Sequence, residues 1–193
     1  HLSYSSPKTQ SRVYSYNLKT KQKQLIKQQE IPSGHNSDDY IVERVDCKSH
    51  DGRMVPLTIT RHKKTIMDGS ANLLLYGYGS YGSSMSPGFS LTKLSLINRD
   101  IIWVTAHIRG GMERGMKWWK EGKLMNKKNS FEDYIASAKY LIEKKYTSKK
   151  KIIGMGGSAG GLLMGAVVNQ APELFLGIIM AVPFVDSLTT NLD

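Results

Sequence analysis

The sequence predicts an α/β protein, built as a parallel sheet with flanking helices. One observation is a series of short apolar runs of the kind found in strands that are buried on both faces. A second is that helix-like segments separate these runs, an alternation typical of strand–helix–strand crossovers. The predicted parallel strands are residues 71–76, 101–106, 151–155 and 177–182.

The chain before residue 71 is more polar, and its apolar residues alternate with polar ones instead of forming continuous runs. Residues 1–31 are polar, and alternating stretches such as residues 12–16 predict a β-hairpin or two strands, too few to fold alone. Residues 32–37 predict a loop and a boundary. Two further strands are expected at residues 40–46 and 54–60, joined at an Asp-Gly pair that favours a hairpin turn.

Three helices are expected between the parallel strands. Two of them are residues 89–98 and 159–169. The third is predicted to begin at Ser130, because Ser130 and Asp133 have the spacing of a capping box. Apolar residues then recur at helical spacing and predict one buried face, made of Phe131, Ile135, Ala138 and Ile142.

The 193 residues include 27 Lys and Arg against 16 Asp and Glu, a formal net charge of +11. Such an excess invites a nucleic-acid interpretation. The basic residues are nearly all Lys, however, and no aromatic residues interleave with Arg to form a base-stacking surface. The basic clusters at residues 19–27, 127–128 and 144–151 are therefore interpreted as solvated faces, and no nucleic-acid partner is expected.

Composition excludes a membrane-spanning protein and a protein held by disulfides or a cysteine-bound metal. No apolar stretch approaches the roughly 18–20 residues that a membrane helix needs, so no membrane association is expected. Cys47 is the single cysteine, which rules out an intrachain disulfide and a cysteine-based metal site. A lone cysteine also fits a reducing compartment.

The motif that points to chemistry is Gly156-Gly157-Ser158-Ala159-Gly160-Gly161, between a predicted strand and a predicted helix. Gly-x-Ser-x-Gly in that context predicts a nucleophile elbow, in which a strained turn lifts the serine hydroxyl clear of the sheet. Small residues on both sides are needed because side chains would clash in so tight a turn. The following helix aims its first amides, including that of Ala159, at the place where an oxyanion would form.

A second glycine motif competes with this interpretation. Gly77, Gly79 and Gly82 fit Gly-x-Gly-x-x-Gly directly after a strand, and Asp100 lies about 20 residues on. A dinucleotide site needs a helix that opens at the third glycine. Residues 83–88 predict coil instead, so this interpretation is not favoured.

A serine nucleophile needs a base and an orienting acid, which follow it in the order Ser, Asp, His in hydrolases with this elbow. All five histidines of the chain precede Ser158, and the acids after it are Glu173, Asp186 and Asp193. The triad is therefore incomplete in this chain. His107 alone lies near the expected active edge, and anchoring of a loop is its favoured interpretation.

Taken together, these motifs resemble those of the prolyl oligopeptidase family of serine peptidases, in particular its oligopeptidase B branch. The matching segments run in family order over residues 71–193, with weaker similarity back to about residue 12. They are Leu74-Leu75-Tyr76-Gly77-Tyr78-Gly79-Ser80-Tyr81-Gly82, Ala106-His107-Ile108-Arg109-Gly110-Gly111, Gly122-Lys123-Leu124, Lys127-Lys128-Asn129-Ser130-Phe131, the elbow, and Val182-Pro183-Phe184-Val185-Asp186.

The resemblance implies a truncated α/β-hydrolase domain preceded by the last strands of a β-propeller. Residues 1–35 would be the propeller remnant and linker, and residues 36–193 the N-terminal part of the peptidase domain. By the same resemblance Ser158 is the acylated nucleophile, and the Tyr78 hydroxyl joins the Ala159 amide in the oxyanion hole. It implies cleavage of short peptides after Arg or Lys, no cofactor or metal, and a cytoplasmic location.

The sequence also departs from the family pattern. It stops before the family's catalytic Asp and His and before the acidic residues that recognise a basic side chain of the substrate. The loop after the Tyr-Gly motif usually carries acidic residues in oligopeptidase B, and residues 84–89 of this loop have none. Met112 replaces a third glycine after Arg109-Gly110-Gly111. We therefore expect little or no peptidase activity from this chain alone. The alternatives are a complementing C-terminal chain, or a non-catalytic remnant or binding module of a split or decaying gene.

Overall fold

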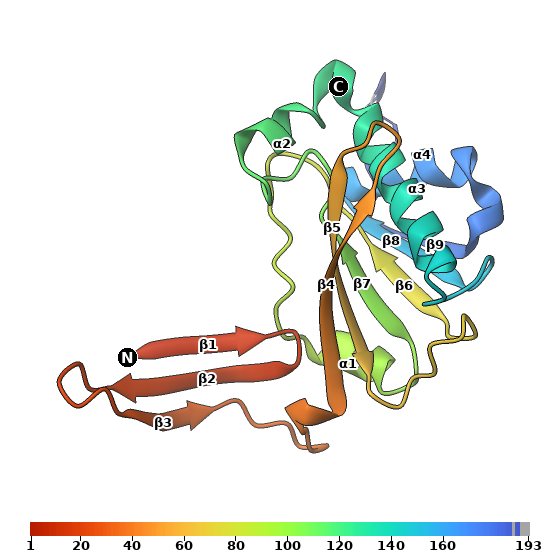
Figure 1. Cartoon of the computed structure of the whole chain (residues 1–193). Coiled ribbons are helices and arrows are strands. Elements are labelled where there is room, and N and C mark those ends of the chain that lie inside the picture. The colour runs from red at the N-terminus through yellow and green to blue at the C-terminus, as the bar shows by residue number, and fades with distance from the viewer. Residues whose placement is uncertain (187, 190–193) are drawn as a thin grey trace.

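The computed structural model describes residues 1–186 and 188–189 and contains two sheets (Figure 1). A three-stranded antiparallel sheet precedes a six-stranded sheet of order β4-β5-β7-β6-β8-β9. The small sheet comprises β1 (Leu2–Ser6), β2 (Thr9–Tyr16) and β3 (Lys23–Gln28). One strand more than the predicted hairpin is present, because the Lys- and Gln-rich segment after residue 22 pairs with β2.

The large sheet confirms the predicted α/β class. The hairpin β4–β5 turns at Gly52, whose positive φ of 84° suits glycine, and β5 runs antiparallel to β7. The remaining neighbours are all parallel. The strands are β4 (Tyr40–Lys48), β5 (Met54–His62), β6 (Leu73–Tyr76), β7 (Ile102–Ala106), β8 (Ile152–Gly157) and β9 (Phe175–Ala181).

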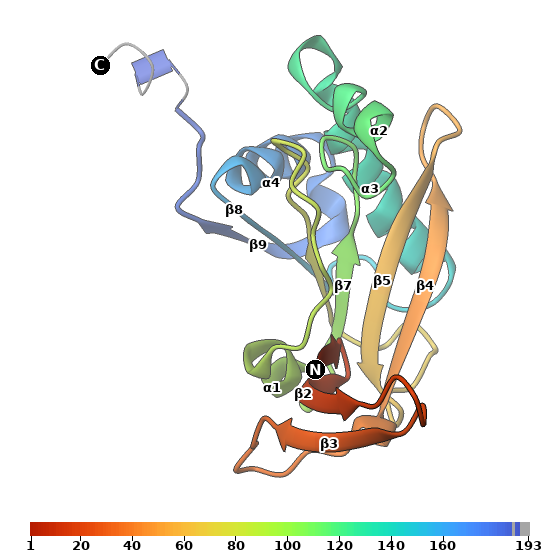
Figure 2. The same cartoon turned by 90° about the vertical axis from the view of Figure 1, so that its left-hand side faces the viewer.

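Helices cover both faces of the large sheet (Figure 2). Because side chains alternate along a strand, Leu73 and Leu75 join the core formed with α3 and α4, whereas Leu74 packs with α1 on the other face. The helices are α1 (Leu91–Ile97), α2 (Met116–Lys120), α3 (Lys128–Glu143) and α4 (Ala159–Gln170), with short 3-10 turns η1 (Ser37–Asp39), η2 (Leu124–Asn126) and η3 (Pro172–Leu174). Within the described residues, no helix has the length and apolarity to cross a membrane.

The predicted start of α3 was wrong. The helix begins at Lys128, so Ser130 lies inside its first turn rather than at its cap. The Ser130 hydroxyl donates to the Arg109 carbonyl at 2.6 Å, and the Asp133 carboxylate accepts from the Arg109 side chain. Both side chains therefore bind Arg109 and do not cap the helix. The predicted buried face is confirmed, with Ile135 and Ala138 in the core and Phe131 and Ile142 packed against it.

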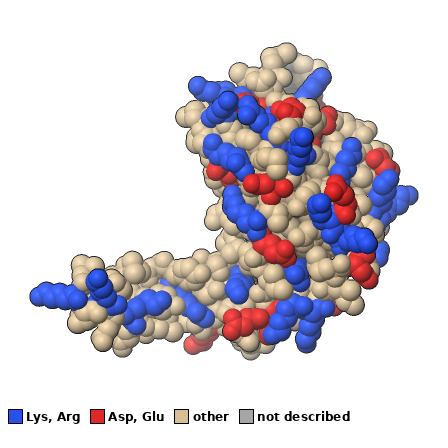
Figure 3. Space-filling model, viewed as in Figure 1, with Lys and Arg blue, Asp and Glu red and all other residues tan. Residues whose placement is uncertain are grey.

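The small sheet forms an arm that projects from the α/β region, and basic side chains are spread along it (Figure 3). The four lysines of its β2–β3 segment are exposed, as the solvated-face interpretation predicts: Lys19, Lys21, Lys23 and Lys27. On the α/β region in the same view, basic and acidic side chains are interspersed.

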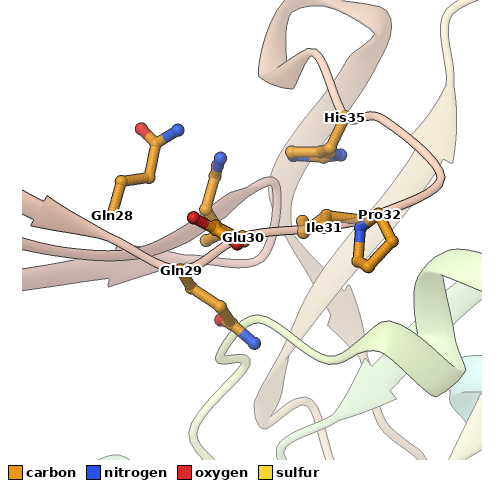
Figure 4. Close-up of a pocket in the computed structure, with 7 residues that line it drawn as sticks. Gln28, Gln29, Glu30, Ile31, Pro32 and His35 are labelled. Atoms are coloured by element: carbon orange, nitrogen blue, oxygen red, sulfur yellow. The ribbon is translucent and has the colours of Figure 1, made fainter.

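The linker after β3 borders a pocket of about 610 Å³ (Figure 4). His35 fixes this linker, because its ring stacks on Tyr40 at 5.1 Å and its Nε2 donates to the Lys8 carbonyl at 2.8 Å. Tyr40 starts β4, and through the β5 pairing it lies toward the amino ends of the parallel strands. The pocket is therefore at the opposite end of the sheet from the elbow, which follows the carboxyl end of β8. Its lining residues are Gln10, Gln28, Gln29, Glu30, Ile31, Pro32 and His35.

Candidate active site

Ser158 lies at a strained turn between β8 and α4. Its φ of 54° and ψ of −119° fall outside the usual regions for a residue with a side chain, and the residue is exposed. Such a conformation costs on the order of 1–3 kcal/mol and persists only where the surroundings hold it. The predicted strand–turn–helix context is confirmed.

Backbone contacts explain why glycine flanks this serine. A Cβ on Gly156 would lie 2.2 Å from the Gly160 carbonyl oxygen, and one on Gly160 would lie 2.9 Å from the Gly77 carbonyl oxygen. A Cβ on Gly161 would lie 2.5 Å from Pro183. The strand, the helix and two neighbouring loops therefore meet at van der Waals distance around the elbow.

The end of β9 and the segment after it hold the elbow from the other side. The Ser158 amide donates to the Ala181 carbonyl at 2.9 Å, and the Ser158 carbonyl accepts from the Phe184 amide at 3.0 Å. The Gly161 amide donates to the same carbonyl at 2.8 Å. The serine backbone is thus fixed on both sides while its side chain remains free to react.

Tyr78 is half-buried in the loop that follows β6, and this loop touches the start of α4. The first loop amide, that of Gly77, donates to the Met155 carbonyl at 3.1 Å. A Cβ on Gly160 would lie 3.6 Å from the Tyr78 Cα, so Tyr78 packs two residues beyond Ser158. Within the described residues the Ala159 amide donates to no acceptor. The sequence-predicted residues Ser158, Tyr78 and Ala159 are therefore brought together.

The Tyr78 loop packs tightly against the turn after β7. The site that a Cβ on Gly110 would occupy lies 1.9 Å from the Gly79 carbonyl oxygen, and both glycines have positive φ. The Gly82 amide donates to the Gly110 carbonyl at 2.9 Å. Residues 83–90 are irregular and α1 begins only at Leu91, so the helix that a dinucleotide site requires is missing after Gly82.

Lys127 contradicts its interpretation as part of a solvated face. Its Nζ donates to the Gly79 carbonyl, to the Ser80 hydroxyl at 2.8 Å and to the Ser130 hydroxyl at 3.4 Å. Burial lowers the pKa of Lys127 to about 8. A run of two lysines gave no signal of this, because the contacts form only when α3 packs beside the Tyr78 loop.

His107 is buried and bound within the sheet rather than directed at Ser158. Its Nε2 lies 2.8 Å from the Thr58 hydroxyl, and its Nδ1 lies 3.5 Å from the Glu113 carboxylate. Glu113 also accepts from the Met85 amide at 2.8 Å. These contacts anchor the loop of residues 83–90, as the sequence interpretation of His107 expects.

Arg109 forms a buried ionic cluster that sequence reasoning missed. Its guanidinium donates to Asp133 at 2.6 Å and also to Asp51, and the side chains of Arg109 and Asp133 are 1% and 0% exposed. Burial by itself would raise the pKa of Asp51, but the hydrogen bonds from Arg109 outweigh it and lower that pKa. The cluster ties the β4–β5 turn and α3 to the turn that supports the Tyr78 loop.

An exposed serine on a strained strand-to-helix elbow, at the carboxyl edge of a mainly parallel sheet, is the arrangement of a serine hydrolase of the α/β class. The profile of the "Prolyl oligopeptidase family" matches residues 87–193, which is more than half of the 193 residues. The chain belongs to this family of serine peptidases.

Relatives and solved structures refine this assignment. The chain is 47% identical to dipeptidyl aminopeptidase BI of Pseudoxanthomonas mexicana, covering 99% of the chain and 26% of that protein. It is 43% identical to protease 2 of Moraxella lacunata, covering 100% of the chain and 28% of that protein. It matches oligopeptidase B from Leishmania major with a TM-score of 0.91 and 40% identity, over 99% of the chain and 27% of that structure. The chain thus spans about a quarter of the length of these relatives.

Proposed function

We propose that the chain carries the nucleophile and the oxyanion site of an oligopeptidase that cleaves short peptides after Arg or Lys. The observation that carries this proposal is the exposed Ser158 on its strained elbow, with Tyr78 and the free Ala159 amide beside it. Similarity to protease 2 and to oligopeptidase B supports the substrate class. A cytoplasmic location belongs to the same proposal and is supported by the single cysteine.

In the proposed reaction, the Ser158 Oγ attacks the carbonyl carbon of the scissile peptide bond while a base removes the hydroxyl proton. The Tyr78 hydroxyl and the Ala159 amide donate to the resulting oxyanion. The bond to nitrogen then breaks, the base returns the proton to the leaving amine, and water hydrolyses the acyl ester.

His107 cannot supply the base, because it is 1% exposed and bound to Thr58 and Glu113. We assign the base and its orienting acid to residues outside this chain, either later in the same gene product or on a complementing chain. Removing such a pair typically lowers the rate by about 10⁴–10⁶-fold, so the isolated chain should hydrolyse peptides at most very slowly.

The small sheet fits the proposal that residues 1–35 belong to a separate propeller domain. All of β3 is exposed, and so are Leu2, Tyr4, Leu25 and Ile26 on this sheet. A three-stranded sheet with so much exposed apolar surface needs further covering. Neighbouring propeller strands would provide it.

The similarity to a dipeptidyl aminopeptidase supports a second candidate, release of dipeptides from a free amino terminus. Two fluorogenic substrates separate the candidates. One is an Arg-Arg dipeptide with a blocked amino terminus, which an endopeptidase accepts, and the other is the same dipeptide with a free amino terminus. The proposed function predicts turnover of the blocked substrate by the whole gene product, meaning this chain with whatever its reading frame adds before His1 and after Asp193.

Ser158→Ala is the control for this assay and should abolish turnover. Turnover of the free substrate alone would favour the aminopeptidase. Turnover of neither substrate by folded gene product would favour a binding module or remnant.

A further inference from the structure

The side chain of Lys127 connects α3 to the loop that carries Tyr78. Its Nζ has three acceptors, and two of them, the Gly79 carbonyl and the Ser80 hydroxyl, lie in the two residues directly after Tyr78. The third is the hydroxyl of Ser130, in the first turn of α3. An ammonium group has three donors, so all of its hydrogen-bonding capacity is directed to this contact.

The Tyr78 loop next to Lys127 rests on the turn after β7. Gly79 has a positive φ of 68° and lies against the Arg109 carbonyl, 2.9 Å from where its Cβ would be. Ser130 donates to that same carbonyl and thereby fixes the surface on which Gly79 rests. Lys127, directly before α3, and Ser130, in its first turn, thus hold the loop and its support.

No counter-ion competes for the ammonium group in the part of the chain that the structure describes. The carboxylates on the neighbouring elements have other partners, since Asp51 and Asp133 bind Arg109 and Glu113 lies against His107 and the Met85 amide. No carboxylate lies within ion-pair distance of Nζ among the described residues. The positive charge is held only by a carbonyl and two hydroxyls.

We propose that Lys127 is a positioning residue that clamps the Tyr78 loop in the geometry that closes the oxyanion site. The reference to an oxyanion site rests on the proposed function, whereas the clamp itself is a property of the fold. The ammonium group donates charge-assisted hydrogen bonds at pH 7, and the neutral amine keeps two of the three donors, so the clamp should hold in both protonation states.

The half-buried position of the amine gives the clamp a pH dependence above neutrality. Because burial lowers the pKa of Lys127 to about 8, the amine is charged at pH 7 and neutral at pH 9.5. Opening of the loop would return the amine to water, where its pKa is the ordinary 10.5, so opening takes up a proton between pH 8 and 10.5. The closed loop should therefore gain stability as the pH rises through this range. Lys127→Arg keeps a charge throughout this range, and Lys127→Met removes it while keeping an apolar stem.

Amide hydrogen exchange of the 193-residue chain tests the clamp without requiring activity. The reporters are the amides of Gly82 and Ser83, which donate to Gly110 and Ser80. With the net strength of a hydrogen bond to a charged group, Lys127→Met should speed their exchange by roughly 10- to 100-fold at pH 7. The amides within β8 should keep their wild-type rates. Lys128→Met, which alters the exposed neighbouring lysine, is the matched control and should change neither set.

The pH arm separates positioning from a merely structural role. After correction for intrinsic exchange, wild type should gain protection at Gly82 and Ser83 between pH 7 and 9.5, while Lys127→Arg and Lys127→Met should show no such step. Equal exchange in wild type and Lys127→Met would overturn the proposal, and so would faster exchange spread over the whole sheet.

Hydrolysis by the whole gene product provides the second readout. A positioning role predicts that Lys127→Met lowers kcat with little change in KM. If exchange responds but no variant and no wild type hydrolyses peptides, the clamp stands and the proposed function fails. If wild type hydrolyses peptides and Lys127→Met leaves exchange and kcat unchanged, the clamp fails and the proposed function stands.

Discussion

Gly156 is the position at which the elbow should be least tolerant of a side chain. The Cβ of Gly156→Ala would lie 2.2 Å from the Gly160 carbonyl oxygen and 2.7 Å from its carbon. Ordinary carbon–oxygen contacts are more than 3 Å, so strand β8 and helix α4 would have to separate by about 1 Å, and both partners are backbone. Overpacking of this kind typically costs about 1–3 kcal/mol.

Gly177→Ala is the matched control for this substitution. Gly177 also lies in a strand of the same sheet, but a Cβ there would meet nothing within 4 Å. Because alanine also restricts the unfolded chain, Gly177→Ala should be neutral or stabilising by a few tenths of a kcal/mol. The two variants should therefore differ by about 1–3 kcal/mol in the free energy of unfolding.

Urea denaturation followed by circular dichroism measures this difference, with unchanged m-values as the check that the two unfolding transitions are comparable. A displacement of about 1 Å at the elbow should also lower the reactivity of Ser158 by about 10²-fold in the whole gene product. Equal stability of Gly156→Ala and Gly177→Ala would refute the close-packed elbow.

Three further predictions concern buried groups. Asp133→Ala should destabilise the fold by about 3–5 kcal/mol in urea, because it leaves the Arg109 guanidinium buried beside one carboxylate instead of two, and a loss below 1 kcal/mol would contradict this. The free energy of unfolding of wild type should rise relative to that of Lys127→Met as the pH goes from 8 toward 10.5, since the lowered pKa of Lys127 means that folding opposes protonation, and a fall over this range would contradict the sign. Burial raises the pKa of Cys47 to about 11, so its thiol should react with a disulfide reagent at pH 8 only after urea unfolds the chain, and rapid reaction of the native protein would contradict this.

Local signals allowed the elbow to be predicted from the sequence. The Gly-x-Ser-x-Gly spacing, the apolar strand before it and the helix after it all lie within about 20 residues, so their geometry follows from the covalent chain. The parallel strands were predictable for the same reason, because each is a continuous apolar run between turns. The structure shifts their ends by one or two residues only.

Contacts between distant segments could not be predicted in this way. Ser130 and Asp133 have the spacing of a helix cap, yet both bind Arg109, which lies more than 20 residues earlier in the chain. Lys127 looked like one of many surface lysines and instead reaches a loop 47 and 48 residues away. In each case a polar side chain binds a partner whose position depends on the packing of α3 against the sheet.

Covalent labelling by a fluorophosphonate, read by intact mass, tests most directly whether Ser158 is the nucleophile. The whole gene product should gain a single adduct that is absent from Ser158→Ala, and the 193-residue chain alone should label at least about 10⁴-fold more slowly for want of a base. An adduct that survives Ser158→Ala, or no adduct on folded gene product, would contradict the assignment of this serine.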